Sequence, residues 1–171
     1  MNIYIVRHTA VDVVNTCYGH TDVPLKKTFE AEAEAVKQKL KDIPYDAVYS
    51  SPLGRAKKLA EYCGYTDIQL YDRLKEMFMG DWEMKQWDEI DLTRWEKDAV
   101  NTPAPNGESI KQLYNRVASF LEELKSTGHS SVIIFAHGGV INCVRAYFGQ
   151  ADLNDLFEDM PQYGEVLNFQ L

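Results

Sequence analysis

The chain has 171 residues, of which 45% are hydrophobic and 12% aromatic, enough for a single domain with a substantial core. Its formal net charge of −8 argues against nucleic acid or an anionic membrane as a partner, because both bind a broad basic surface. Ten glycines and six prolines leave no room for a long low-complexity region, so the whole chain is expected to fold.

The chain contains no pattern typical of a signal peptide, and no stretch approaches about 18 apolar residues. Its three cysteines, Cys17, Cys63 and Cys143, are widely spaced and form no CxxC pair, which predicts neither a disulfide framework nor a zinc site. We therefore expect a cytoplasmic protein with reduced thiols that needs no metal ion or cofactor.

The first predicted strand lies at the N-terminus. Residues 3–6 (IYIV) have no polar alternation, which is typical of a strand buried on both faces, and Arg7 and His8 follow directly. After a long irregular loop, a helix is expected from near Thr28, with one apolar face formed by Phe29, Ala33, Val36 and Leu40.

Two further units repeat the order of strand, turn and helix. Residues 47–49 form an apolar run, and Arg55 falls in the first turn of the helix that follows. Residues 132–136 (VIIFA) form the clearest strand, which is followed by His137, two glycines and a helix at about residues 140–148. The glycines allow close approach of a ligand, and the helix N-terminus offers free N–H groups.

The segment between the second and third units is less regular. Residues 74–107 contain all three tryptophans and are expected to form a cap on the substrate side, and residues 109–125 have the apolar spacing of a long amphipathic helix. The alternation of strands and helices predicts an α/β fold, a three-layer α/β/α sandwich with a mostly parallel central sheet. We expect residues 1–171 to form one domain.

Charged side chains and imidazoles follow the ends of the predicted strands or begin the next helix. Arg7, His8, Arg55 and His137 come from three separate units of the chain. The carboxyl ends of parallel strands meet at one edge of a sheet, which is where open α/β sheets bind ligands. An Arg-His pair alone is a weak indication, but together these residues predict an anion-binding site.

With these motifs the chain resembles the histidine phosphatase superfamily, also called phosphoglycerate mutase-like. The resemblance rests on Arg7-His8 and on residues 51–56 (SPLGRA), 74–76 (LKE), 80–83 (GDWE), 107–109 (GES) and 136–139 (AHGG). It covers nearly the whole chain and implies the phosphoglycerate mutase-like fold and an enzyme that hydrolyses phosphate monoesters.

The resemblance implies a chemical role for each central residue. His8 would attack phosphorus through a neutral ring nitrogen, and water would then cleave the phosphohistidine. Arg7, Arg55 and His137 would bind phosphate oxygens, while Glu76 would protonate the leaving group. The guanidinium groups are expected to lower the pKa of His8 and keep it nucleophilic.

Further candidates for substrate binding lie in two turns. Asn15, His20 and Thr21 belong to the loop after the first strand, and Gly138 follows His137. The position at which the family carries a phosphate-binding asparagine is Val14 here, so contact between Asn15 and phosphate stays open. Arg116 follows the GES motif and is expected to be a helix-face or ion-pair residue, and His129 to be exposed.

The chain departs from the family pattern at Thr9 and Met84, where glycine is usual, and at Leu59, where threonine is usual. Residues 7–13 (RHTAVDV) and 17–25 (CYGHTDVPL) resemble the α-ribazole 5′-phosphate phosphatase branch, which acts in cobalamin nucleotide-loop assembly. The resemblance to this branch implies α-ribazole 5′-phosphate, or its corrinoid-linked form, as the substrate.

Other functions stay open. A broad-specificity small-molecule phosphatase is the main alternative, and a mutase is less expected because it needs extra basic residues and usually inserted structure. A metal-dependent hydrolase would need ligand motifs such as HxH or HExxH, which are missing. A noncatalytic phosphate-binding module is disfavoured by the complete set of reactive residues. The sequence leaves the oligomeric state undetermined.

Overall fold

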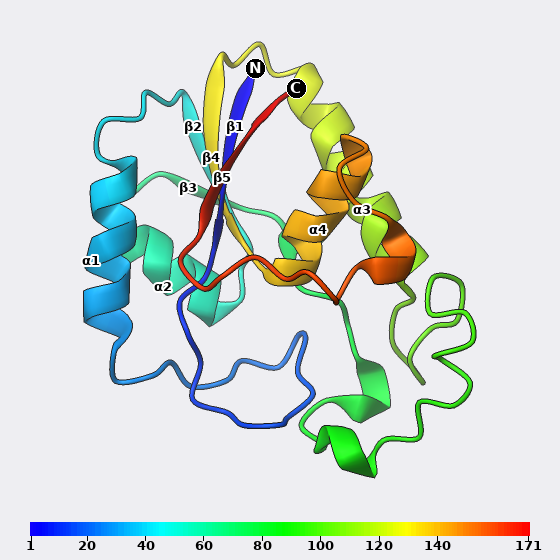
Figure 1. Cartoon of the computed structure of the whole chain (residues 1–171). Coiled ribbons are helices and arrows are strands. Elements are labelled where there is room, and N and C mark those ends of the chain that lie inside the picture. The colour runs from blue at the N-terminus through cyan, green and yellow to red at the C-terminus, as the bar shows by residue number, and fades with distance from the viewer.

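A five-stranded sheet forms the centre of the computed structural model, which describes residues 1–171, and its strand order is β3-β2-β4-β1-β5 (Figure 1). The five strands are β1 (Asn2–Arg7), β2 (Ala47–Ser50), β3 (Ile68–Leu70), β4 (Ser131–Ala136) and β5 (Val166–Gln170). Strands β1 to β4 are parallel, and β5 pairs antiparallel with β1.

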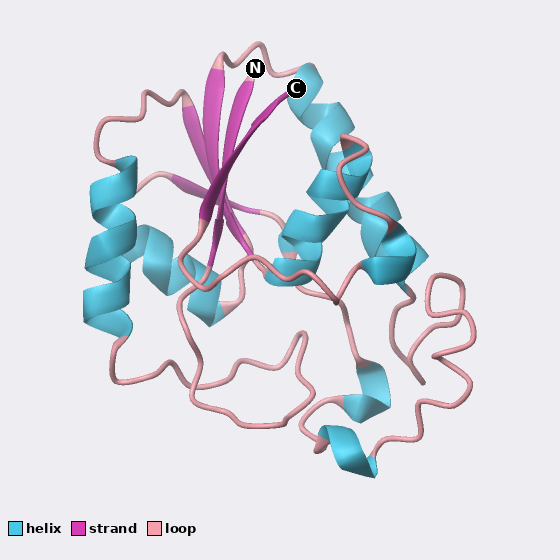
Figure 2. Ribbon diagram, in the orientation of Figure 1, coloured by secondary structure: helices cyan, strands magenta, loops and turns pink.

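Helices cover both faces of this sheet (Figure 2). One face carries α1 (Phe29–Leu40) and α2 (Gly54–Tyr62), and the other carries α3 (Ile110–Lys125) and α4 (Gly138–Tyr147). The predicted three-layer α/β/α architecture with a mostly parallel sheet is confirmed. None of these helices has the length and apolarity needed to cross a membrane.

The central strands alternate their side chains between two hydrophobic clusters. Val48, Ile133 and Phe135 pack with α1 and α2, whereas Ile5 and Ile134 belong to the larger cluster with α3 and α4. Every residue of β2 and β4 is buried. A strand buried on both faces favours apolar residues at successive positions, which explains the apolar runs at residues 47–49 and 132–136.

The register of β1 and β4 fixes the two imidazoles at one level. Arg7 pairs with Ala136 at the carboxyl ends of the two strands, and the N–H of His8 donates to the Ala136 carbonyl at 3.1 Å. His8 and His137 therefore leave neighbouring strands at the same edge of the sheet.

One helix cap and one helix boundary differ from those expected. Thr28 precedes α1 as predicted, but its hydroxyl bonds to Glu32 and caps no backbone N–H group. Helix α4 begins at Gly138, about two residues earlier than predicted, because both glycines after His137 already have helical geometry. By contrast, α3 begins with a capping box in which Ser109 and Gln112 satisfy each other's N–H groups.

Residues 74–107 contain no α-helix and no strand of the sheet, only short 3₁₀ turns. In Figure 1 this green segment lies below the carboxyl ends of the strands, beside the loop that follows β1. Trp82, Ile90 and Ala104 belong to the same hydrophobic cluster as α3 and α4. The segment therefore packs as part of the wall around the sheet's functional edge.

Candidate active site

His8 is almost completely buried at the end of β1, with 2% of its surface exposed. Its Nδ1 lies 2.7 Å from the carbonyl oxygen of Thr9, and a carbonyl can only accept, so Nδ1 carries the ring proton. In the neutral ring the Nε2 atom then keeps its lone pair, which is the arrangement a nucleophilic imidazole requires.

Burial lowers the pKa of His8 well below its ordinary value, because charging a desolvated ring is unfavourable. The positive charges of Arg55 and then Arg7 lower it further, and the hydrogen bond to Thr9 opposes them. The ring is therefore neutral near pH 7, as expected from the neighbouring guanidinium groups.

His137 faces His8, with 5.2 Å between their ring centroids. Its Nε2 lies 2.8 Å from the hydroxyl oxygen of Ser51, which also accepts the N–H of Leu53. When the Ser51 hydroxyl donates to Nε2, the proton of His137 sits on Nδ1, and Nδ1 is buried without any partner. Burial and the charge of Arg55 lower the pKa of His137 well below its ordinary value.

Arg55 is a buried cation held by the loop after β1. Its guanidinium donates to the carbonyl oxygens of Gly19 at 2.6 Å and Thr21 at 3.1 Å, and Asp22 lies 3.7 Å away. The Nε of Arg55 has no partner. The side chain therefore fixes this loop and keeps one donor unused.

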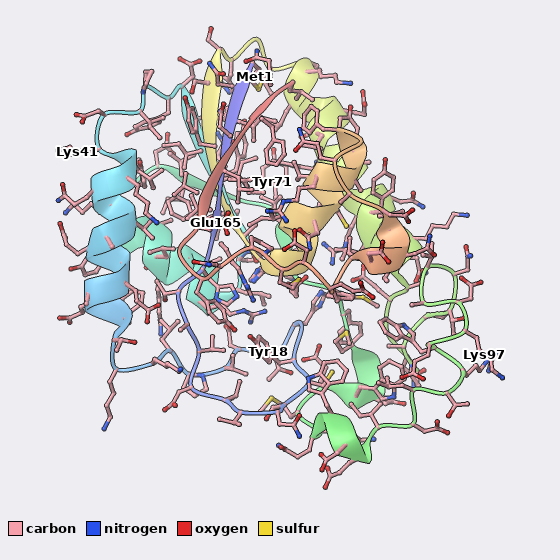
Figure 3. All side chains as sticks on the ribbon, in the orientation of Figure 1. Met1, Tyr18, Lys41, Tyr71, Lys97 and Glu165 are labelled. Atoms are coloured by element: carbon pink, nitrogen blue, oxygen red, sulfur yellow. The ribbon has the colours of Figure 1, made fainter.

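Arg7 contacts the segment just before β5. Its guanidinium donates to the Pro161 carbonyl and lies 4.1 Å from the ring centroid of Tyr163, a cation–π contact. Its Nε is buried and unpaired. The hydroxyl of Tyr163 lies 3.2 Å from that of Tyr18, which belongs to the loop below the sheet in Figure 3.

The carboxylate of Glu76 lies against the first turn of α4. One oxygen accepts the N–H of Met77 and the other the N–H of Gly139, each at 3.0 Å. A Cβ atom on Gly139 would stand 2.4 Å from Glu76 Oε1, so only glycine allows this close approach. At Gly138, a Cβ would lie 3.3 Å from the guanidinium carbon of Arg7, which puts this glycine beside the site as well.

A cavity of about 440 Å³ opens next to His8. Arg7, His8 and Glu76 supply its charged or titratable lining, and Thr16 adds a hydroxyl. The rest of the wall is aromatic or thioether: Tyr18, Met77, Met79, Trp87, Trp95, Phe157 and Met160. Such a wall suits the apolar part of an organic ligand, with the reactive groups at one end.

The predicted substrate-binding residues divide into two groups. Thr21 borders the site through its carbonyl, which holds Arg55. Asn15 and His20 do not line the cavity. The exposed side chain of Asn15 donates to Asp88 at 3.2 Å, and the ring of His20 stacks on Phe78 with 4.7 Å between centroids. The Nε2 atom of His20 is buried without a partner. Contact of His20 or Asn15 with the substrate stays a prediction.

Several residues around the site had no assigned role in the sequence. Ser51 belongs to the motif at residues 51–56, which could have indicated a role at the site, but its contact with His137 was not predicted. Tyr163 and Met160 come from an irregular segment without periodicity, and only the antiparallel direction of β5 brings them here.

The expected ion-pair role of Arg116 is observed, with Glu108 as its partner. No three His, Cys, Asp or Glu side chains converge in a metal-binding arrangement.

Comparison with known proteins gives a consistent family and several substrates. A family model described as the histidine phosphatase superfamily (branch 1) matches residues 3–168. A provisionally named phosphoserine phosphatase 2 of Hydrogenobacter thermophilus is 30% identical over 154 residues, covering 83% of this chain and 75% of that protein. The adenosylcobalamin/alpha-ribazole phosphatase of Escherichia coli is 27% identical over 158 residues, covering 85% and 78%.

Among solved structures, the alpha-ribazole phosphatase from Shigella flexneri superposes with a TM-score of 0.88. The match covers 100% of this chain and 91% of that one at 24% identity, so it bears on the fold alone. The relatives agree on phosphate-ester chemistry and differ in the substrate they are named for.

Proposed function

The chain belongs to the histidine phosphatase superfamily, whose members act on phosphate esters, and from this premise we propose that it is a phosphomonoesterase with His8 as its nucleophile. The observation that carries the proposal is a set of buried nitrogens without partners around His8: Nε of Arg7, Nε of Arg55 and Nδ1 of His137. Buried donors without acceptors are costly, and the oxygens of a phosphoryl group would satisfy them.

In the first step, the lone pair on His8 Nε2 forms a bond to phosphorus while the bond from phosphorus to the leaving oxygen breaks. Glu76, in its protonated form, gives a proton to that oxygen. Arg7, Arg55 and His137 donate to the three remaining phosphoryl oxygens, where negative charge is concentrated.

In the second step, water attacks the phosphohistidine and the bond from phosphorus to nitrogen breaks. The carboxylate left on Glu76 accepts the proton of the attacking water. This returns His8 to its neutral form and Glu76 to its acid form, and inorganic phosphate leaves.

For the substrate, we propose α-ribazole 5′-phosphate or its corrinoid-linked form. The support is the sequence of the loop after β1 together with the aromatic and thioether wall beside His8. A benzimidazole base can pack against tryptophan and phenylalanine rings, whereas the ammonium and carboxylate of phosphoserine would be desolvated there without partners. The cavity volume falls within the range usual for small-molecule sites, about 300–1,000 Å³.

A broad-specificity phosphatase is the second candidate, and it is favoured by the scarcity of polar groups in the cavity wall. Beyond the catalytic end, only the hydroxyls of Thr16 and Tyr18 and the indole of Trp87 or Trp95 could form directional hydrogen bonds. Arg7 is the only cation lining the cavity, so the second phosphate of a mutase intermediate would find no further partner there.

A substrate panel tests both candidates. In the presence of a chelator, α-ribazole 5′-phosphate, phosphoserine and sugar phosphates are compared by kcat/KM, and acid-labile phosphate on the protein is measured after a rapid quench. We expect the aromatic nucleotide to be preferred by more than about tenfold, which corresponds to about 1.4 kcal/mol. Equal turnover across the panel would favour broad specificity, and full activity of His8→Ala would overturn the mechanism.

A further inference from the structure

Arg116 and Glu108 form an ion pair close to Glu76 without entering the cavity. Arg116 Nε lies 2.7 Å from Glu108 Oε1, and a second nitrogen lies 2.8 Å from Oε2, so the pair is bidentate. The two side chains are only 17% and 19% exposed. Neither lines the cavity, and all five N–H groups of Arg116 already donate to acceptors within the protein.

The same guanidinium holds the backbone that carries Glu76. It donates to the carbonyl oxygens of Arg73 at 2.8 Å, Lys75 at 2.6 Å and Glu76 itself at 2.8 Å. Glu108 Oε2 also accepts the N–H of Phe78 at 2.8 Å. The pair thus binds four backbone groups within residues 73–78.

These backbone groups have few other hydrogen-bond partners. Beyond the short turn that ends at Leu74, the chain here is neither helix nor strand, so no ladder of backbone hydrogen bonds fixes it. Buried backbone groups must find partners, and here two side chains from α3 and the turn before it provide them. The place of Glu76 therefore depends on Arg116 and Glu108.

We propose that Arg116, supported by Glu108, is a positioning residue that fixes the carboxyl group of Glu76 at the leaving oxygen of the substrate. The inference rests on the proposed function, in which Glu76 supplies the proton. The carboxylate is aligned on one side by the N–H of Gly139, and its backbone is anchored on the other by Arg116. A displacement of about 1 Å at a reacting group can reduce the rate by about 100-fold.

A positioning role makes a prediction that a merely structural role does not. The proton from Glu76 matters when the leaving group is an alcohol, and it matters little when the leaving group is p-nitrophenolate, which departs as an anion. Benzyl phosphate and p-nitrophenyl phosphate are aromatic esters of similar size that differ in this respect. Their kcat/KM values report formation of the phosphoenzyme, the step that needs the proton.

The first variant is Arg116→Lys, which keeps the charge but cannot reach Glu108 and three carbonyls together. We expect kcat/KM for benzyl phosphate to fall by about 10- to 100-fold and that for p-nitrophenyl phosphate to change by less than about threefold. Glu76→Gln should reproduce this dependence on the leaving group.

Removing Arg116 alone leaves the half-buried Glu108 carboxylate unpaired, which can unfold the protein. The double variant Arg116→Met with Glu108→Gln avoids that charge and should give the same pattern. Arg73→Lys is the matched control, because the Arg73 side chain pairs with Glu123 on the surface of α3 and holds none of this backbone. Thermal unfolding confirms that each variant is folded.

The outcomes test the positioning role of Arg116 and the proposed function separately. If Glu76→Gln distinguishes the esters and folded Arg116 variants lower both equally, the positioning role is wrong and the proposed function stands. If Glu76→Gln does not distinguish them, the proton-donor role and the positioning role are both wrong. Full activity of His8→Ala would overturn the proposed function itself.

Discussion

The two imidazoles at the site are both buried and both held neutral. Desolvation is the main cause, and nearby arginines act in the same direction on the pKa of His8 and of His137. A group whose pKa is lower in the folded than in the unfolded state binds fewer protons when folded. The unfolded chain therefore gains protons first on acidification, and the folded state loses stability relative to it.

We accordingly expect the free energy of unfolding to fall as the pH drops below about 6.5, the ordinary pKa of histidine in an unfolded chain. Above that value both states carry neutral rings, so these residues contribute no slope. Urea unfolding between pH 7.5 and pH 5 measures this dependence for the wild type and for His8→Gln with His137→Gln. Carboxylates contribute equally to both proteins, so the difference isolates the imidazoles.

His129→Gln is the control for this experiment, because His129 lies in the turn before β4, away from the site. The change of slope in the double variant should exceed the change in this control. An identical slope in the wild type and the double variant would contradict the buried-imidazole interpretation.

At the level of elements, the start of α4 connects the sheet edge to the proton donor. Gly139→Ala adds a methyl group that would lie 2.4 Å from Glu76 Oε1, so the carboxylate must move away from the N–H of residue 139. The obstacle is the end of a flexible side chain, and alanine favours the helix by up to about 1 kcal/mol. Stability should therefore change little while catalysis suffers.

For this variant we expect kcat/KM toward benzyl phosphate to fall by about 10- to 100-fold, with the urea midpoint nearly unchanged. Gly149→Ala is not a suitable comparison because Gly149 has a positive φ, so Ala146→Gly, near the other end of α4, serves as the contrasting change. It should lower stability by about 1 kcal/mol and spare catalysis. A large loss of stability in Gly139→Ala without loss of rate would refute the argument.

The turn between the short 3₁₀ helices Gly80–Trp82 and Trp87–Glu89 contains a strained residue. Met84 has φ of 67°, in the left-handed region, and its N–H donates to the Cys17 carbonyl at 2.7 Å. This is the position at which glycine is usual in the family, and glycine adopts this conformation without the steric cost borne by methionine. The substitution by methionine is therefore tolerated at some cost in stability.

Met84→Gly should raise the free energy of unfolding by up to about 1 kcal/mol, because relief of strain outweighs the greater entropy of glycine in the unfolded chain. Met84→Ala keeps the strain and removes the same exposed side chain, so it should bring no gain. Urea unfolding of the three proteins measures the difference, and equal stabilities of the glycine and alanine variants would count against strain at this turn.

Across the fold, the sequence predicted the strands and helices that burial and periodicity mark with a clear apolar pattern. Strands β1, β2 and β4 were identifiable because each contains an uninterrupted apolar run. Strand β3 has three residues, two of them exposed, and β5 alternates polar residues at the sheet edge, so neither stood out. Half-exposed edge strands need fewer apolar residues, which weakens their pattern.

At the site, too, residues next to regular elements were predictable and residues in irregular segments were not. His8, His137 and Arg55 follow strands or begin a helix, so parallel topology alone predicted that they converge. The cation–π contact of Arg7 with Tyr163 depends on the antiparallel pairing of β5 with β1, in which Val166 pairs with Val6. Contacts built from irregular segments have no period in the sequence, and the structure was needed to find them.

The direction of the strands also separates the termini from the chemistry. The N-terminal amino group donates to the Leu171 carbonyl at 2.8 Å, and both chain ends lie beside the start of β1, at the end of the strands opposite the site (Figure 1). A short glycine-serine linker can therefore join residue 171 to residue 1 without strain. Termini this close generally permit circular permutation when the new ends fall in exposed loops.

A permutant opened between Gly128 and His129 has its new ends in the turn before β4, at the same end of the sheet as the natural termini. We expect it to fold and to keep kcat/KM within about threefold of the wild type, a change of less than about 0.7 kcal/mol. A permutant opened between Met84 and Lys85 cuts the turn just before Trp87 of the cavity wall, where the Lys85 carbonyl accepts the N–H of Cys17. That protein should lose most of its activity toward benzyl phosphate even when folded. Equal activity of the two permutants would mean that this turn does not help to form the site.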